Sequence, residues 1–217
     1  SSFVRMTTSG SRQIHYAGHS VTVEYDHPLI ETILNNIIYP FTSTNPITNP
    51  SIFRVEYQED QEPTYILYLD GAQIYKAKHQ IDFAEMLLSK ICYQLAFHSK
   101  DGMLFHAAGL AYKGQGILVP GGIGFGKSTF TAWMVSQGCD YLSDEFVYFA
   151  WGSRQMQSFS RPLHLKKPSR DVLSQMINYK SDENLIHVGS HSDLVHPNLF
   201  KPNNLYTQPP VQLILFP

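Results

Sequence analysis

One glycine-rich octapeptide constrains the fold of this chain more than any other feature. Residues 121–128 read GGIGFGKS and match G-x-x-x-x-G-K-[ST], the pattern of a phosphate-binding loop. Glycines let the backbone form a ring of inward N–H groups, Lys127 can reach the β- and γ-phosphates, and the Ser128 hydroxyl can ligate Mg²⁺. The pattern therefore predicts a nucleoside triphosphate site. The residues expected to contact the nucleotide are Gly121, Gly122, Ile123, Gly124, Phe125, Gly126, Lys127, Ser128 and Thr129.

The segments on either side of the octapeptide have the character that such a loop requires. Residues 116–119 are apolar and predict a strand that runs into the loop. Residues 128–137 predict a helix, which Gly138 would end, because glycine is favoured just past a helix terminus. The positive end of that helix would then face the phosphates. A glycine-rich turn that binds nothing would not need this order of strand, loop and helix.

The composition is that of an ordinary globular chain of 217 residues, 43% hydrophobic and 16% charged, long enough for one large or two small domains. The net charge of −2 gives no basic surface, so we expect no nucleic-acid partner. No apolar run reaches 18 residues and no signal-peptide layout is present, so we expect no membrane partner. Cys92 and Cys139 fit buried, reduced thiols of a cytoplasmic protein.

Residues 1–100 are expected to form a β-rich region with two helices. One helix would be capped by Asp26 and ended by Pro40, and the other, over residues 81–97, carries a continuous apolar stripe. Asp70-Gly71 is a strong hairpin signal between two of the strands. The segments with strand character are residues 20–25, 53–57, 65–69 and 73–76.

Residues 101–217 are expected to hold the phosphate-binding core. A strand over residues 103–112 would turn at residues 113–116 and return into the loop. After the loop helix, a strand over residues 139–142 would continue past Asp144-Glu145 into residues 146–150. The remaining expectations are an extended segment at 164–167, a helix at 170–179, mostly loop at 181–210, and a strand at 211–217, at an end that is either trimmed or natural.

Phosphoryl chemistry at such a loop needs a carboxylate that holds the metal and a group that handles the proton of the nucleophile. Asp144 and Glu145 are the best candidates, because strand ends open onto the ligand crevice of an α/β sheet; the alternative is a solvated loop. His106 interrupts an aliphatic strand and is either a satisfied core residue or an active-site group.

Basic side chains after residue 150 could approach the phosphates, although such residues more often form a solvated edge; these are Arg161, Lys166 and Lys167. His187 and His191 have helical spacing, but Gly189-Ser190 between them argues against a helix and therefore against a metal pair.

Three segments together resemble the catalytic core of HPr kinase/phosphorylase and of the smaller HPr-kinase-related proteins. They are Phe105-His106-Ala107-Ala108-Gly109, the glycine loop, and Tyr141-Leu142-Ser143-Asp144-Glu145, and the strong resemblance covers about residues 103–149. Glu145 stands where HPr kinase carries Asp, and the downstream Gly- and Arg-containing signature that accompanies phosphorylase activity has no counterpart. The chain is therefore more similar to the smaller related kinases.

The resemblance implies an α/β fold with a P-loop kinase core of the HPr kinase/phosphoenolpyruvate carboxykinase type. It also implies transfer of the γ-phosphoryl group of ATP to a serine or other hydroxyl of a peptide or protein. In that reading Asp144 is the general base, His106 assists it, Lys127 binds the phosphates, and Ser128 with Glu145 holds Mg²⁺.

Two other functions remain open from the sequence. An ATP-binding regulatory protein would use the same loop without transfer, and a small-molecule kinase or carboxykinase-like enzyme would use another acceptor. The expected partner is a peptide or protein that bears a serine, and a homo-oligomer is a further alternative.

Overall fold

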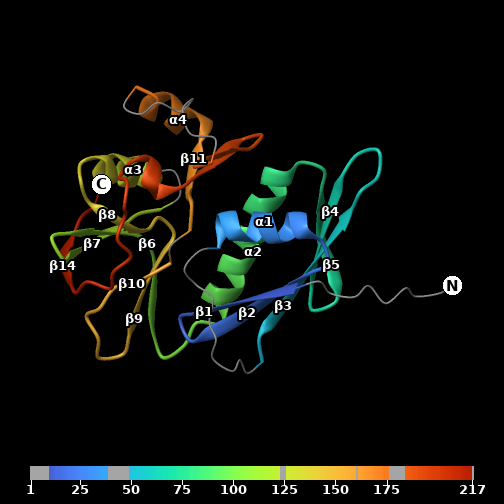
Figure 1. Ribbon diagram of the computed structural model, residues 1–217. Coiled ribbons are helices and arrows are strands. Elements are labelled where there is room, and N and C mark those ends of the chain that lie inside the picture. The colour runs from blue at the N-terminus through green and yellow to red at the C-terminus, as the bar shows by residue number, and fades with distance from the viewer. Residues whose placement is uncertain (1–9, 39–48, 123–125, 160, 176–183, 217) are drawn as a thin grey trace. The chain divides into compact units, whose positions relative to one another are not determined.

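The computed structural model of the chain describes residues 10–38, 49–122, 126–159, 161–175 and 184–216 (Figure 1). In these ranges the protein is mixed α/β, with four α-helices and 14 strands that form three sheets. The chain divides into two compact units, Ser1–His98 and Ser99–Pro217, which we describe separately. None of the helices in the described ranges is long and apolar enough to cross a membrane.

The first unit contains a five-stranded sheet. Its strands follow the order of the sequence, and all neighbours are antiparallel except β2 and β3, which run parallel. The parallel pair needs a crossover connection, and α1 lies within it. The strands are β1 (Gly10–Tyr16), β2 (His19–Tyr25), β3 (Ser51–Gln58), β4 (Thr64–Leu69) and β5 (Ala72–Ala77).

The two predicted helices of this unit are present as α1 (Pro28–Ile37) and α2 (Gln80–Phe97). The predicted cap of α1 is wrong by one residue. His27, not Asp26, has the extended backbone of an N-cap, and its Nδ1 accepts a hydrogen bond from Leu29 N at 3.1 Å. The apolar stripe of α2 is buried and packs against β2, β4 and β5. Pro40 lies outside the described residues.

The second unit is organised around β6 (Gly102–Tyr112), an 11-residue strand. The antiparallel strand β7 (Gln115–Pro120) occupies one edge of β6. The other edge is shared by β8 (Asp140–Ser143) and β9 (Phe146–Ala150), both antiparallel to β6. The segment predicted as one strand over residues 139–150 therefore follows a single edge, but the structure interrupts it at a bend formed by Asp144 and Glu145.

The glycine-rich loop predicted to bind phosphate lies between β7 and α3 (Lys127–Ser136). Gly138 follows the helix with φ of 107°, as predicted for a residue just past a helix terminus. Because β7 and β8 both run antiparallel to β6, they are parallel to each other and end on the same side of the sheet. The loop after β7 and the acidic pair after β8 therefore meet at one sheet end.

Residues 181–210 were expected to be mostly loop, and the structure corrects this in part. A third sheet has the order β11-β13-β12, and a short 3₁₀ helix, η1 (Pro197–Leu199), follows it. The strands are β11 (Leu163–Lys166), β12 (Ile186–Val188) and β13 (Ser192–Val195). His187 lies on β12, so the segment with His191 is not a helix, as the glycine between them indicated.

The remaining elements complete the second unit. Helix α4 (Lys167–Leu173) begins earlier than the predicted residue 170, because Pro168 suits the first turn of a helix, and residues 176–179 of that prediction lie outside the described residues. The terminal strand is present as β14 (Val211–Ile214) and pairs in parallel with β7. The two-residue strand β10 (Gln157–Ser158) extends the sheet beyond β9.

A hydrophobic core fixes the third sheet against the loop helix. Ala108 and Val119 of the central sheet, Ala132 of α3, and Leu165 and Val195 of the third sheet belong to one buried cluster. Burial of such side chains is worth about 1.5–3 kcal/mol each for the larger aliphatic ones. This packing brings the segment before β11 to the sheet end that carries the loop. Cys92 and Cys139 are both buried, as expected.

Candidate active site

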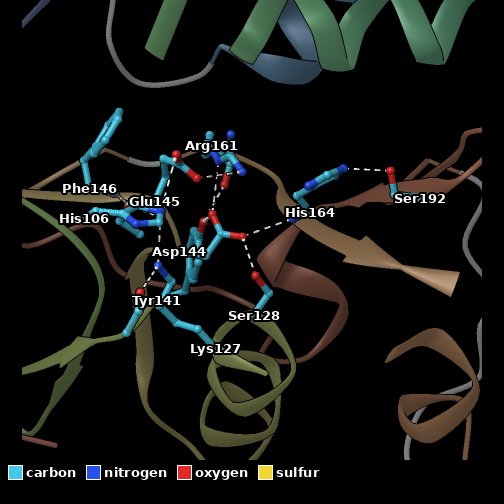
Figure 2. Close-up of polar contacts among 12 residues, drawn as sticks. His106, Lys127, Ser128, Tyr141, Asp144, Glu145, Phe146, Arg161, His164 and Ser192 are labelled. Carbon is cyan, nitrogen blue, oxygen red and sulfur yellow. Dashed lines mark hydrogen bonds and ion pairs between the residues drawn. The ribbon is translucent and has the colours of Figure 1, made fainter. Parts of the chain in front are cut away.

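A cavity of about 380 Å³ lies where β7 and β8 end. It combines residues of the glycine loop, the acidic pair, β6 and the segment leading into α4. The lining residues are His106, Gly122, Gly126, Lys127, Ser128, Thr129, Asp144, Glu145, Arg161, His164, Lys166 and Ser169. Most of the site residues predicted from the sequence are therefore gathered in one place, and the polar contacts among them are shown in Figure 2.

The pairing of β6 explains how His106 reaches this cavity. His106 is opposite Phe146, the first residue of β9, and its neighbour Ala107 is opposite Pro120, the last residue of β7. The amide of Ala107 also donates a hydrogen bond to the carbonyl oxygen of Glu145 at 3.1 Å. His106 thus lies between the loop and the acidic pair, and it is not a satisfied core histidine, because 42% of its side chain is exposed.

Only part of the glycine loop can be described. Gly126 has φ of 72°, in the left-handed region that favours glycine, and it immediately precedes α3. Gly121 contributes its carbonyl oxygen, which accepts a hydrogen bond from Lys127 Nζ at 3.3 Å, and Gly122 lines the cavity. The predicted contact residues Ile123, Gly124 and Phe125 lie outside the described residues.

Lys127 is buried, although it carries an ammonium group. Burial lowers the pKa of Lys127, while the negative charges of Glu145 and Asp144 act in the opposite direction. The Nζ atom lies 3.3 Å from His106 Nε2, an interaction in which a protonated Lys127 donates and the imidazole nitrogen accepts. The charge of Lys127 is thus held inside the cavity, where a phosphate group would be its strongest partner.

Asp144 is almost completely buried, with 2% of its surface exposed, and four donors surround its carboxylate. Oδ1 accepts from Arg161 Nε at 3.1 Å, and the Tyr141 hydroxyl lies 3.2 Å from Oδ1. The single proton of that hydroxyl is shared with the carbonyl oxygen of Arg161, which is closer at 2.8 Å. Oδ2 accepts from the backbone amide of His164 at 3.1 Å and from Ser128 Oγ at 3.3 Å. The guanidinium of Arg161, the amide of His164 and the hydroxyl of Ser128 thus stabilise the buried charge.

Glu145 is the more accessible of the two carboxylates, with 27% of its side chain exposed. Its Oε1 lies 3.7 Å from His106 Nε2, and its Oε2 lies 3.5 Å from Arg161 Nη2. The two acidic residues, adjacent in sequence, therefore differ in surroundings: Asp144 faces the loop helix through Ser128, and Glu145 faces His106. Asp144 is therefore not a solvated loop residue, which was the alternative expected for both acidic residues.

Arg161 was expected to belong to a solvated edge more often than to a phosphate site, yet it is buried between both carboxylates. Tyr141 was named only as part of the segment Tyr141–Glu145 and given no role, and it is completely buried with its hydroxyl in the site. Lys166 lines the cavity, whereas Lys167 is not among the lining residues. No local pattern marks Arg161, because it reaches the site through tertiary packing.

The residues present fit a magnesium ion bound together with a nucleotide. Mg²⁺ prefers oxygen ligands, and in nucleotide sites it is held by one or two carboxylates, phosphate oxygens and water. Ser128 and Asp144 supply a hydroxyl and a carboxylate whose oxygens are 3.3 Å apart. Across the described ranges, no group of three or more His, Cys, Asp or Glu side chains could hold a metal by itself.

No protein-family model matches this chain, and no curated protein matches it either. The fold and the site define the protein only as a mixed α/β chain whose second unit gathers residues of a glycine-rich loop and an acidic pair around one cavity.

Proposed function

We propose that the chain is an ATP- and Mg²⁺-dependent kinase that phosphorylates a serine or other hydroxyl of a peptide or protein. The observation that carries this proposal is the convergence of Lys127, Ser128 and the pair Asp144-Glu145 on one cavity. Phosphoryl transfer requires little covalent chemistry from a protein. It requires positioning, neutralisation of phosphate charge, and an acceptor for the proton of the nucleophile.

The loop side of the cavity supplies the nucleotide contacts. Lys127 would place its ammonium against the β- and γ-phosphates, and the N-terminus of α3 would add the positive end of its dipole. Ser128 with Glu145 would hold Mg²⁺ in the reading implied by the resemblance, and the contact between Ser128 and Asp144 adds a second carboxylate near that position. When bound, Mg²⁺ would neutralise charge on the β- and γ-phosphates.

The acidic side of the cavity supplies the group that receives the proton. The acceptor hydroxyl oxygen forms a bond to the γ-phosphorus, and the bond between that phosphorus and the bridging β–γ oxygen breaks. ADP leaves, and the hydroxyl proton moves to a carboxylate. In the proposed scheme Asp144 receives the proton at Oδ2 when Ser128 Oγ, 3.3 Å away, turns toward the bound nucleotide. His106 assists from beside the acidic pair, where its Nε2 lies 3.7 Å from Glu145 Oε1.

The proposal extends to the fold and the family. The order of His106, glycine loop and acidic pair along the chain, together with their convergence, supports a core of the HPr kinase/phosphoenolpyruvate carboxykinase type. It also supports a relationship to the smaller HPr-kinase-related proteins, and a cytoplasmic location would suit such an enzyme. These statements rest on three short segments of the chain.

The acceptor class can be tested with three pools, each incubated with the purified chain, Mg²⁺ and ATP labelled in the γ-phosphoryl group. One pool is a set of serine-containing peptides, the second is the same set with alanine at every serine, and the third is a mixture of small hydroxyl metabolites. We expect label in the serine peptides and not in the alanine set. Label only in the metabolites would favour a small-molecule kinase, and ATP binding without transfer to any pool would favour a regulatory protein.

A further inference from the structure

Arg161 is the one arginine among the residues that line the cavity, and its environment is unusual for an arginine. The residue is 7% exposed, and a single guanidinium group contacts both carboxylates of the acidic pair. Arg161 Nε lies 3.1 Å from Asp144 Oδ1, and Arg161 Nη2 lies 3.5 Å from Glu145 Oε2 (Figure 2). Because the guanidinium is planar and rigid, these two contacts fix the directions of the carboxylates relative to each other.

The main chain of Arg161 is anchored as well. The Tyr141 hydroxyl, which is 3.2 Å from Asp144, lies 2.8 Å from the carbonyl oxygen of Arg161. Tyr141 is itself held by Asn204, whose Oδ1 accepts from Tyr141 N at 2.6 Å and whose Nδ2 donates to Tyr141 O at 3.0 Å. Arg161, Tyr141 and Asn204 are all buried. Arg161 is therefore attached to the framework through its backbone and to the acidic pair through its side chain.

Two adjacent carboxylates repel each other, and one of them is buried. Without a cation between them, they would separate, or Asp144 would bear the cost of an unpaired buried charge. A guanidinium that bridges them removes both effects and leaves the more exposed Glu145 beside His106. A lysine could supply the charge but not the two-armed geometry.

We propose that Arg161 is a positioning residue that holds the carboxylates of Asp144 and Glu145 in the arrangement needed for Mg²⁺-nucleotide binding and phosphoryl transfer. This inference deepens the proposed function and rests on it. Arg161 acts through the two carboxylates, so its replacement should weaken Mg²⁺-dependent nucleotide binding and phosphoryl transfer. The phosphate contacts made by the glycine loop should be unaffected. Binding of a metal-free nucleotide, which depends on the loop and Lys127, is the part expected to survive.

The decisive variant is Arg161→Lys, because it retains a positive charge and removes the two-armed contact. The matched control is Arg154→Lys: Arg154 is an exposed arginine of the same unit whose Nη2 donates to the carbonyl oxygen of Val211 at 3.2 Å. For the parent chain and both variants, isothermal titration measures the dissociation constant of ADP with EDTA and with Mg²⁺. Phosphoryl transfer from ATP to the pool of serine-containing peptides is then measured, with separate kcat and KM values for ATP. The unfolding temperature shows whether each variant is folded.

In Arg161→Lys we expect the strengthening of ADP binding by Mg²⁺ to fall about 10–100-fold, as for other residues that orient metal-holding side chains. Metal-free binding should stay within about 2-fold of the parent, a change worth about 0.4 kcal/mol. The kcat should fall by about 100-fold with a much smaller change in KM, because misplacement of reacting groups acts on the transfer step. Arg154→Lys should match the parent.

Two results would overturn the inference. The first is an Arg161→Lys variant in which Mg²⁺ strengthens ADP binding as much as it does in the parent. The second is an equal loss of binding with and without Mg²⁺ together with a lower unfolding temperature, which indicates a merely structural ion pair. Arg161→Ala with added guanidinium provides an independent check, since millimolar guanidinium should restore part of the Mg²⁺ effect in that variant and not in Arg161→Lys.

The same experiment separates this inference from the proposed function. A parent chain that binds ADP with Mg²⁺ but transfers no phosphate contradicts the kinase proposal, while the Mg²⁺ dependence of Arg161→Lys still decides the role of Arg161. A parent chain that binds no nucleotide overturns both.

Discussion

Ser128 Oγ lies 3.3 Å from Asp144 Oδ2, although 16 positions separate the two residues in the sequence. This contact follows from the topology. Ser128 is the second residue of α3, the helix that follows the loop after β7, and Asp144 directly follows β8. Both strands are antiparallel to β6 and so end together. A hydroxyl from the loop helix and a carboxylate from a strand end thereby share one point of the cavity, next to the position where Ser128 and Glu145 would hold Mg²⁺.

Replacement of Lys127 tests the nucleotide contact. We expect Lys127→Ala to weaken ATP binding by about 10–100-fold, because a hydrogen bond to a charged group contributes about 1.5–3 kcal/mol. Lys113→Ala is the control, since Lys113 lies in the exposed turn between β6 and β7. Isothermal titration measures both. An ATP affinity of Lys127→Ala equal to that of the control would contradict the loop assignment.

The lowered pKa of Lys127 predicts a pH dependence of stability. Since the folded state holds the proton of Lys127 less tightly than the unfolded chain, the unfolded chain binds more protons between the lowered pKa and the ordinary value of 10.5. The contribution of Lys127 to the free energy of unfolding therefore rises with pH across that window. Lys127→Met lacks this contribution. If the variant has a higher free energy of unfolding than the parent at pH 7, that difference should therefore shrink as the pH rises toward 10.5. Urea unfolding measures the two profiles, and parallel profiles would refute the prediction.

Asp144→Asn should abolish phosphoryl transfer and leave ATP binding nearly intact. It should also lower the free energy of unfolding by about 3 kcal/mol, because an amide nitrogen would face donors such as Arg161 Nε in a buried site. Asp171→Asn, on the exposed side of α4, is the control for both measurements. Transfer that persists in Asp144→Asn would remove Asp144 from the role of base.

Gly116 tests the packing of the sheet that carries the loop. A Cβ atom at this position would overlap the Met156 sulfur and lie 2.8 Å from the carbonyl oxygen of Pro210, whose oxygen accepts the Gly116 amide at 2.9 Å. Gly116→Ala should therefore destabilise the protein by about 1–3 kcal/mol, as overpacking does. Urea unfolding of this variant is compared with that of Gln115→Ala, at an exposed neighbour. Equal stability of the two would contradict the close approach of the Pro210 segment.

Local signals predicted the regular elements well where periodicity and turn chemistry agreed. The Asp70-Gly71 hairpin is confirmed, with φ of 48° and 87°, and the strand pair around the turn at Lys113-Gly114 is confirmed with φ of 50° and 77°. The long helix α2 begins at Gln80, one residue before its predicted start. In each case neighbouring residues carry the whole signal.

Elements that depend on distant partners were missed. Strand β1 has few apolar residues, and its pairing with β2 defines it more than its own sequence does. Strands β12 and β13 are three and four residues long, too short for an alternation to be read, and they form by pairing with each other and with β11.

The candidate site divides in the same way. The loop and the acidic pair are contiguous motifs, so their residues could be named from the sequence alone. Arg161 carries no such motif, because its contacts with the acidic pair are ion pairs made across the fold. The unequal burial of Asp144 and Glu145 likewise depends on the packing of β11 and α3 around the bend, which no local pattern reports.

The most direct test of the central claim is the fate of the γ-phosphoryl group. A native lysate is incubated with the purified chain, Mg²⁺ and γ-¹⁸O-labelled ATP, and its peptide and protein fractions are analysed by mass spectrometry beside a reaction with Asp144→Asn. The account predicts labelled phosphoserine, or another labelled hydroxyl, with the parent chain only. ATP binding by the parent chain without any transfer of label would contradict it.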